Sequence, residues 1–83
     1  MSPEGYFYRK RVFENKDYIK TILENEKIYG RREEDLLLGA LVSLKDNMKR
    51  YMKADPGEES DFLNDHITEY CKKINEYLIL IKD

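Results

Sequence analysis

Apolar residues in the second half of the chain form two stripes whose positions match in reverse order. Along each stripe the steps alternate between four and three residues, which keeps the side chains on one face of a helix. The facing pairs are Leu37 with Ile81, Leu41 with Tyr77, Leu44 with Ile74, Met48 with Tyr70, and Tyr51 with Ile67. The pattern therefore predicts two antiparallel helices that share one seam.

Charged residues and a turn motif mark the ends of these helices. Acidic residues occupy 33–35, where the positive end of the first helix is expected, and basic residues cluster near its other end at 49–53. An Asp-Pro-Gly sequence at 55–57 then stops the helix, because proline disfavours helical geometry in the residue before it and glycine permits a turn. We expect one helix at about 32–54 and the next at about 60–81.

A further helix is predicted in the first third of the chain. Its apolar stripe consists of Tyr18, Ile19, Ile22, Leu23 and Tyr29. Gly30 follows, a residue suited to the left-handed turn after a helix. We expect this helix at about 15–29, with an alternative start at residue 3, because Ser-Pro-Glu at 2–4 is typical of a helix start. Residues 6–13 also fit an extended segment, although neither alternating set gives a purely apolar face.

These patterns predict an all-α fold, a three-helix antiparallel bundle in which the second and third helices form a long core hairpin. A helix pair of this size leaves half of each apolar stripe in water, so the first helix must lie along or across the hairpin. The length of 83 residues suits a single helical domain spanning 1–83.

Composition limits the setting in which the chain works. It has 15 basic and 17 acidic residues, and a net charge of −2 gives no bulk attraction to nucleic acid or to an anionic membrane. Cys71 is the only cysteine, which rules out an internal disulfide and favours a reducing compartment. Neither a leader-like apolar stretch nor a membrane-length one is present. We therefore expect a cytoplasmic protein without membrane contacts.

The sequence contains no recognisable catalytic arrangement, so we expect a protein that is not an enzyme and needs no cofactor. His66 is the only histidine, and its neighbour Asp65 points about 100° away from it on a helix. The sequence has no glycine-rich phosphate loop and no metal-spaced Cys or His pair. A magnesium site, or an active site assembled across a dimer, would require acids from separate helices to converge.

Surplus apolar surface is the most informative feature for function. The hairpin seam uses one stripe on each helix, and residues outside that stripe crowd at the end of the hairpin where 36–44 meets 77–81. The candidate partner-binding residues are Leu38, Val42, Tyr51, Tyr77, Ile79 and Leu80. Either the first helix covers this end, or it is a protein interface, a role that seven tyrosines also favour. We expect a non-enzymatic interaction module, a small adaptor, regulator or inhibitor, that docks another protein or forms a homo-oligomer.

The alternative function is nucleic-acid binding through an aromatic and basic N-terminal segment. Its candidate residues are Tyr6, Tyr8, Arg9, Lys10 and Arg11, with Lys45, Lys49 and Lys53 as auxiliaries. Aromatic rings could stack on bases while the cations meet phosphates. In the competing interpretation, the rings pack the first helix onto the hairpin and the cations remain in water.

Overall fold

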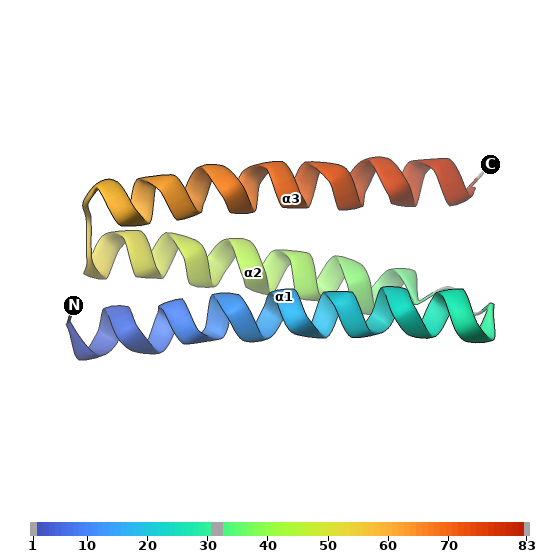
Figure 1. The fold of residues 1–83 in the computed structure, drawn as a ribbon, viewed down its shortest axis with the longest axis horizontal. Coiled ribbons are helices and arrows are strands. Elements are labelled where there is room, and N and C mark those ends of the chain that lie inside the picture. The colour runs from blue at the N-terminus through green and yellow to red at the C-terminus, as the bar shows by residue number, and fades with distance from the viewer. Residues whose placement is uncertain (1, 31–32, 83) are drawn as a thin grey trace.

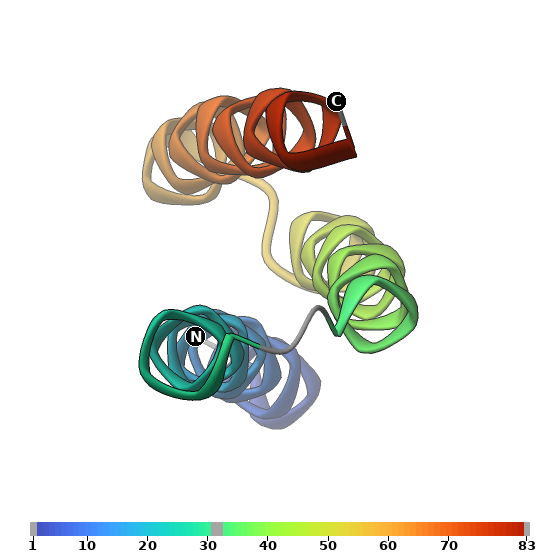
Figure 2. The same cartoon turned by 90° about the vertical axis from the view of Figure 1, so that its right-hand side faces the viewer.

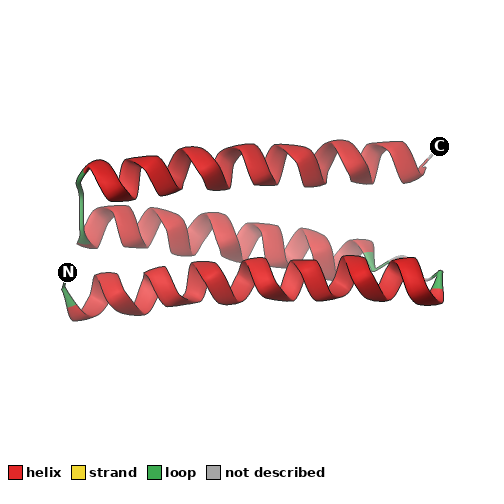
Figure 3. Ribbon diagram, viewed as in Figure 1, coloured by secondary structure: helices red, strands yellow, loops and turns green. Residues whose placement is uncertain are grey.

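A computed structural model describes the backbone of residues 2–30 and 33–82, and the side chains over these ranges up to residue 80. It contains three helices, α1 (Pro3–Tyr29), α2 (Glu34–Ala54) and α3 (Glu58–Lys82), and no strand within the described ranges (Figures 1 and 3). The helices run alternately up and down in an elongated bundle that measures 41 × 19 × 16 Å. The predicted all-α antiparallel bundle, with α2 and α3 as a hairpin, is confirmed.

Helix α1 begins at residue 3, the alternative start, so residues 6–13 are helical and the extended interpretation is wrong. The Oγ atom of Ser2 accepts a hydrogen bond of 2.9 Å from the Gly5 N–H, and Pro3 occupies the first turn. The Asp55 carboxylate, from the turn after α2, accepts from the Ser2 N–H at 3.0 and 3.2 Å. The N-terminus of α1 is thereby tied to the end of α2.

The other helix ends follow the turn residues closely. Gly30 has φ 67°, in the left-handed region, and its N–H donates to the Glu26 carbonyl at 2.7 Å. Helix α2 is described from Glu34 onward, and the predicted start at residue 32 lies outside the described residues. Helix α3 begins at Glu58, directly after Gly57 and two positions before the predicted start.

Helix α2 supplies most of the core. The buried apolar residues are Val12, Ile19 and Ile22 of α1; Leu37, Ala40, Leu41, Leu44, Met48 and Tyr51 of α2; and Ile67, Cys71, Ile74 and Leu78 of α3. Every predicted seam residue of α2 is therefore buried, as are Ile67 and Ile74 of α3. The side chain of Ile81 lies outside the described residues.

The α3 stripe differs from the predicted one in its other positions, because this helix faces two neighbours. Cys71 and Leu78 are buried, and each lines a groove against α2. Tyr70 is half-buried beneath the ammonium of Lys16 of α1, and Tyr77 lines a groove against α1. The two tyrosines therefore belong to the α1 side of α3 and not to the α2 seam.

The three helices are unequally spaced, as the end-on view in Figure 2 shows. Helices α1 and α2 lie within 8 Å of each other, Cα to Cα, over a greater length than α2 and α3 do. A polar cluster joins the closer pair: Asn47 Nδ2 donates to Asn15 Oδ1 at 3.0 Å, and Ser43 lies beside both. No described Cα atom of α1 lies within 8 Å of one in α3, so long side chains bridge that pair.

Candidate protein interface

The six predicted partner-binding residues differ widely in exposure. Their exposed fractions are 46% for Leu38, 68% for Val42, 2% for Tyr51, 37% for Tyr77, 64% for Ile79 and 74% for Leu80. Tyr51 is buried in the core, so the prediction that it belongs to a binding surface is wrong. Its spacing on α2 already matched the buried seam.

Helix α1 covers the apolar end of the hairpin only in part: its last turns lie against Tyr77 of α3, whereas Leu38 and Val42 of α2 stay exposed. Because α1 and α2 are antiparallel, the first turns of α1 lie beside the last turns of α2. Two contacts fix this register: the Ser2 N–H bonds to Asp55, and the Arg50 guanidinium lies 5.8 Å from the centre of the Tyr8 ring. Residues 6–13 therefore pack near the far end of α2, and the side chains of Leu38 and Val42 stay in water.

Three of the predicted residues lie on a shared face of α2 and α3. Leu38 and Ile79 line one groove of about 230 Å³, and Val42 follows Leu38 by one helical turn. Leu80 points about 100° away from Ile79 because successive helical residues diverge by that angle. Tyr77 lies on the α1 side of α3. The structure thus reduces the candidate surface to Leu38, Val42 and Ile79, which we call the α2/α3 face.

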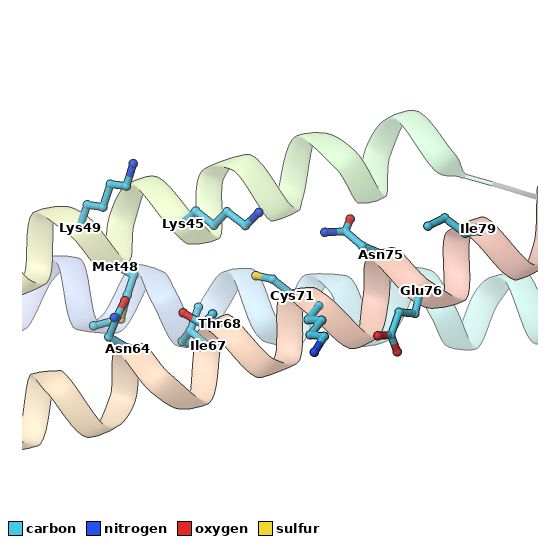
Figure 4. A pocket seen from close by; sticks show the side chains of 11 residues that line it. Lys45, Met48, Lys49, Asn64, Ile67, Thr68, Cys71, Asn75, Glu76 and Ile79 are labelled. Atoms are coloured by element: carbon cyan, nitrogen blue, oxygen red, sulfur yellow. The ribbon is translucent and has the colours of Figure 1, made fainter.

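A larger groove of about 440 Å³ continues this face between the same two helices (Figure 4). Its apolar lining comes from Met48, Ile67 and Cys71, and Ile79 lies at one end. Lysine side chains border it: Lys45 and Lys49 from α2, and Lys72 from α3. The sequence pattern identified the two α2 lysines, but it missed Lys72, which only the packing of α3 brings to the same groove.

Burial controls the chemistry of the cysteine in this groove. Desolvation raises the pKa of the Cys71 thiol, and the nearby Lys45 ammonium partly opposes that rise. Burial likewise raises the pKa of Tyr70. The thiol therefore stays protonated at neutral pH, and it packs as a small apolar group.

The residues of the nucleic-acid alternative are divided between different grooves. Arg9 lies 3.4 Å from the Glu59 carboxylate and 5.3 Å from the centre of the Phe13 ring, and Lys10 lies 4.0 Å from Glu14. Tyr6 and Arg11 are exposed, whereas Tyr8 is half-buried under Arg50. Lys45 and Lys49 line the α2/α3 groove, and Lys53 is exposed near the end of α2. The two basic sets do not share one groove.

A third groove, of about 690 Å³, lies between α1 and α3 and holds a polar residue that the sequence pattern did not reveal. Glu26 lines it with Leu23 and Tyr77 and is only 9% exposed. Among the described residues, none donates a hydrogen bond to its Oε2 atom. A buried carboxylate oxygen without a partner costs free energy, so Glu26 weakens this end of the bundle.

The remaining chemical candidates do not assemble into a site. The Nε2 atom of His66 lies 2.9 Å from the Lys16 ammonium, which connects α3 to α1 at an exposed position. Among the described residues, no three His, Cys, Asp or Glu side chains gather where they could hold a metal ion. None of the three helices, over its described length, is both long and apolar enough to cross a membrane.

Comparison with protein-family models, with curated proteins and with solved structures found no match for this chain. The α2/α3 face and the groove that continues it are therefore the features that point to a function.

Proposed function

We propose that this chain is a non-enzymatic protein interaction module, an adaptor, regulator or inhibitor that docks a partner on the α2/α3 face. The observation that carries the proposal is the apolar group of Leu38, Val42 and Ile79, exposed beside a groove with an apolar floor. Contiguous exposed apolar residues next to a groove are typical of protein interaction surfaces. The lysines at the groove border would supply the polar rim that such interfaces carry.

Site-specific cross-linking tests this proposal. A photoreactive benzophenone side chain replaces Val42 in one variant and Ile79 in another, and the matched control carries it at Phe62, which is 78% exposed near the start of α3. We expect cross-linked products in cells from the Val42 and Ile79 variants and none from the Phe62 variant. If the two test positions give no product, or no more than Phe62 gives, the α2/α3 face is not an interface.

Nucleic-acid binding has weaker support, because Arg9 and Lys10 each lie near a glutamate and Arg50 covers the Tyr8 ring. Fluorescence anisotropy with single-stranded oligonucleotides at two salt concentrations measures it. Salt-sensitive binding that disappears in a variant with alanine at 9, 10 and 11 would favour this function over the docking proposal.

A further inference from the structure

Helix α2 carries a second line of residues with the spacing of a helix–helix seam. Asp35, Leu38, Val42, Lys45 and Lys49 follow one another at steps of three, four, three and four residues, and all five are exposed. The first line, from Leu37 to Tyr51, is already buried against α1 and α3. The second line therefore has the geometry to pack another helix, and no described residue of this chain covers it.

The residues along this second line complement the same line of a second helix that runs in the opposite direction. An acid stands at its start, two apolar residues lie in the middle, and lysines stand at its end. If a second α2 runs antiparallel to the first, Leu38 faces Val42 of the other copy and Asp35 faces Lys45. An interface around a two-fold axis repeats each contact, so one reversed pairing gives two apolar contacts and two ion pairs.

We propose that the partner on the α2/α3 face is a second copy of this chain, joined through an antiparallel pairing of the two α2 helices. This inference rests on the proposed function and names the partner of the same face. The two-fold axis crosses α2 at the level of Ala40, midway between Leu38 and Val42, on the side of the helix opposite to that buried residue. Lys49 extends toward the acidic first turn of the other α2.

Two further observations support close packing at this axis. Gly39 lies beside Val42 and Asp35 on the helix surface, and a Cβ atom built on it meets no atom of the described residues within 4 Å. Its missing side chain lets a second helix approach the backbone. Ile79 of α3 shares a groove with Leu38, so it adds apolar area at the same level. The net charge of −2 per chain opposes association only weakly.

Sedimentation velocity over a wide concentration range tests the pairing. We expect the wild-type chain to shift from monomer to dimer as concentration rises. Asp35→Lys and Lys45→Glu each turn two attractive pairs into two repulsive ones, so each variant alone should weaken dimerisation by roughly tenfold. Asp17→Lys and Lys20→Glu make the same charge changes on α1 and should leave the dimer unchanged.

Mixing the two charge variants separates a pairing effect from a folding defect. In an equimolar mixture of Asp35→Lys and Lys45→Glu, both facing pairs again join opposite charges, so dimers should reappear at concentrations where each variant alone is monomeric. A misfolded variant would not recover on mixing. Failure of the mixture to recover, or a wild-type dimer that neither variant weakens, overturns the antiparallel α2 pairing.

The outcomes also distinguish this inference from the proposed function. A wild-type chain that stays monomeric at every concentration overturns self-association, whether or not another protein occupies the face. The proposed function fails separately, when benzophenone at Val42 and Ile79 gives no cross-linked product of any kind. Cross-links from Val42 to a different protein, together with a monomeric chain, would leave the docking face in place with a foreign partner.

Discussion

Gly5→Ala tests the contact between the first turn of α1 and the turn that follows α2. Gly5 is buried, and a Cβ atom built on it would overlap the Asp55 carboxylate. In the third position of a helix, alanine is ordinarily the better residue, by roughly 0.5–1 kcal/mol. The contact with Asp55 reverses this preference, because the carboxylate has to move away from the helix end to make room for the new methyl group.

The expected cost follows from what Asp55 does in place. Both its oxygens accept from the single Ser2 N–H, at 3.0 and 3.2 Å, and its charge lies at the positive end of α1. A hydrogen bond to a charged group contributes about 1.5–3 kcal/mol, and a charge at a helix terminus about 0.3–1 kcal/mol. Asp55 is only half-buried, so we take the lower ends of both ranges. After the gain from alanine, we expect a net loss of about 1 kcal/mol.

Thermal unfolding followed by circular dichroism measures the effect, and for a chain of this size 1 kcal/mol corresponds to a Tm lower by roughly 4–8 °C. Gly39→Ala is the matched control, and both variants are measured at a concentration where the wild-type chain is monomeric, because Gly39 lies in the proposed dimer interface. Gly39 is also helical, its built Cβ meets no described atom within 4 Å, and the substitution should raise the stability by up to about 1 kcal/mol.

A second variant determines whether Asp55 causes the loss. In an Asp55→Ala background the obstructing carboxylate is absent, so Gly5→Ala should become stabilising by about 0.5 kcal/mol. The change of sign is the decisive result. If Gly5→Ala stabilises the wild-type chain, or costs the same in both backgrounds, the reasoning about this contact is refuted.

Three other substitutions probe the interior by chemical denaturation. Asn47→Ala leaves Asn15 without its main partner and should cost about 1–2 kcal/mol, and an unchanged denaturation midpoint would show that the cluster contributes nothing. Glu26→Leu removes a buried carboxylate oxygen that has no partner in the described part of the chain, and it should raise the stability by about 1 kcal/mol. A loss would mean that the carboxylate is hydrogen-bonded in solution. Burial raises the pKa of Cys71 above the ordinary 9.0 and that of Tyr70 above 10.0. The contribution of these two groups to the free energy of unfolding is therefore complete below these values, and it is lost as pH rises toward the pKa values in the folded chain. Cys71→Ala should reduce the first part of this loss of stability at alkaline pH. If the variant and the wild type have identical pH profiles of stability, Cys71 does not cause that loss.

The α2 half of the fold could be predicted from the sequence because this helix is central. Its seam from Leu37 to Tyr51 faces neighbours on both sides, so every member is buried whichever neighbour covers it. Helix α3 divides its side chains between two neighbours: Cys71 lies against α2, and Tyr70 lies against α1. Spacing alone does not distinguish these two, since both lie within a turn of Ile74.

Two errors arose from contacts between residues far apart in the sequence. Gly5 is unfavourable inside a helix, which favours the later start at residue 15, yet it is required in the first turn because Asp55 approaches from the turn between α2 and α3. Tyr51 was assigned both to the seam and to the binding surface, and its burial in the core leaves only the seam. For the candidate site, the sequence pattern predicted Leu38, Val42 and Ile79. The groove, and the position of Lys72 at its border, could not be predicted because they depend on how far α3 lies from α2.

The unequal spacing of the helices gives the chain a built-in reporter of local opening. Helix α3 approaches the backbone of α2 alone, and Cys71 is held at that boundary with 2% of its surface exposed. A thiol reagent therefore reaches the sulfur only when α3 moves away from α2. Because the chain has a single cysteine, its rate of modification follows the free energy of that opening, separately from global unfolding, in a protein without any added label.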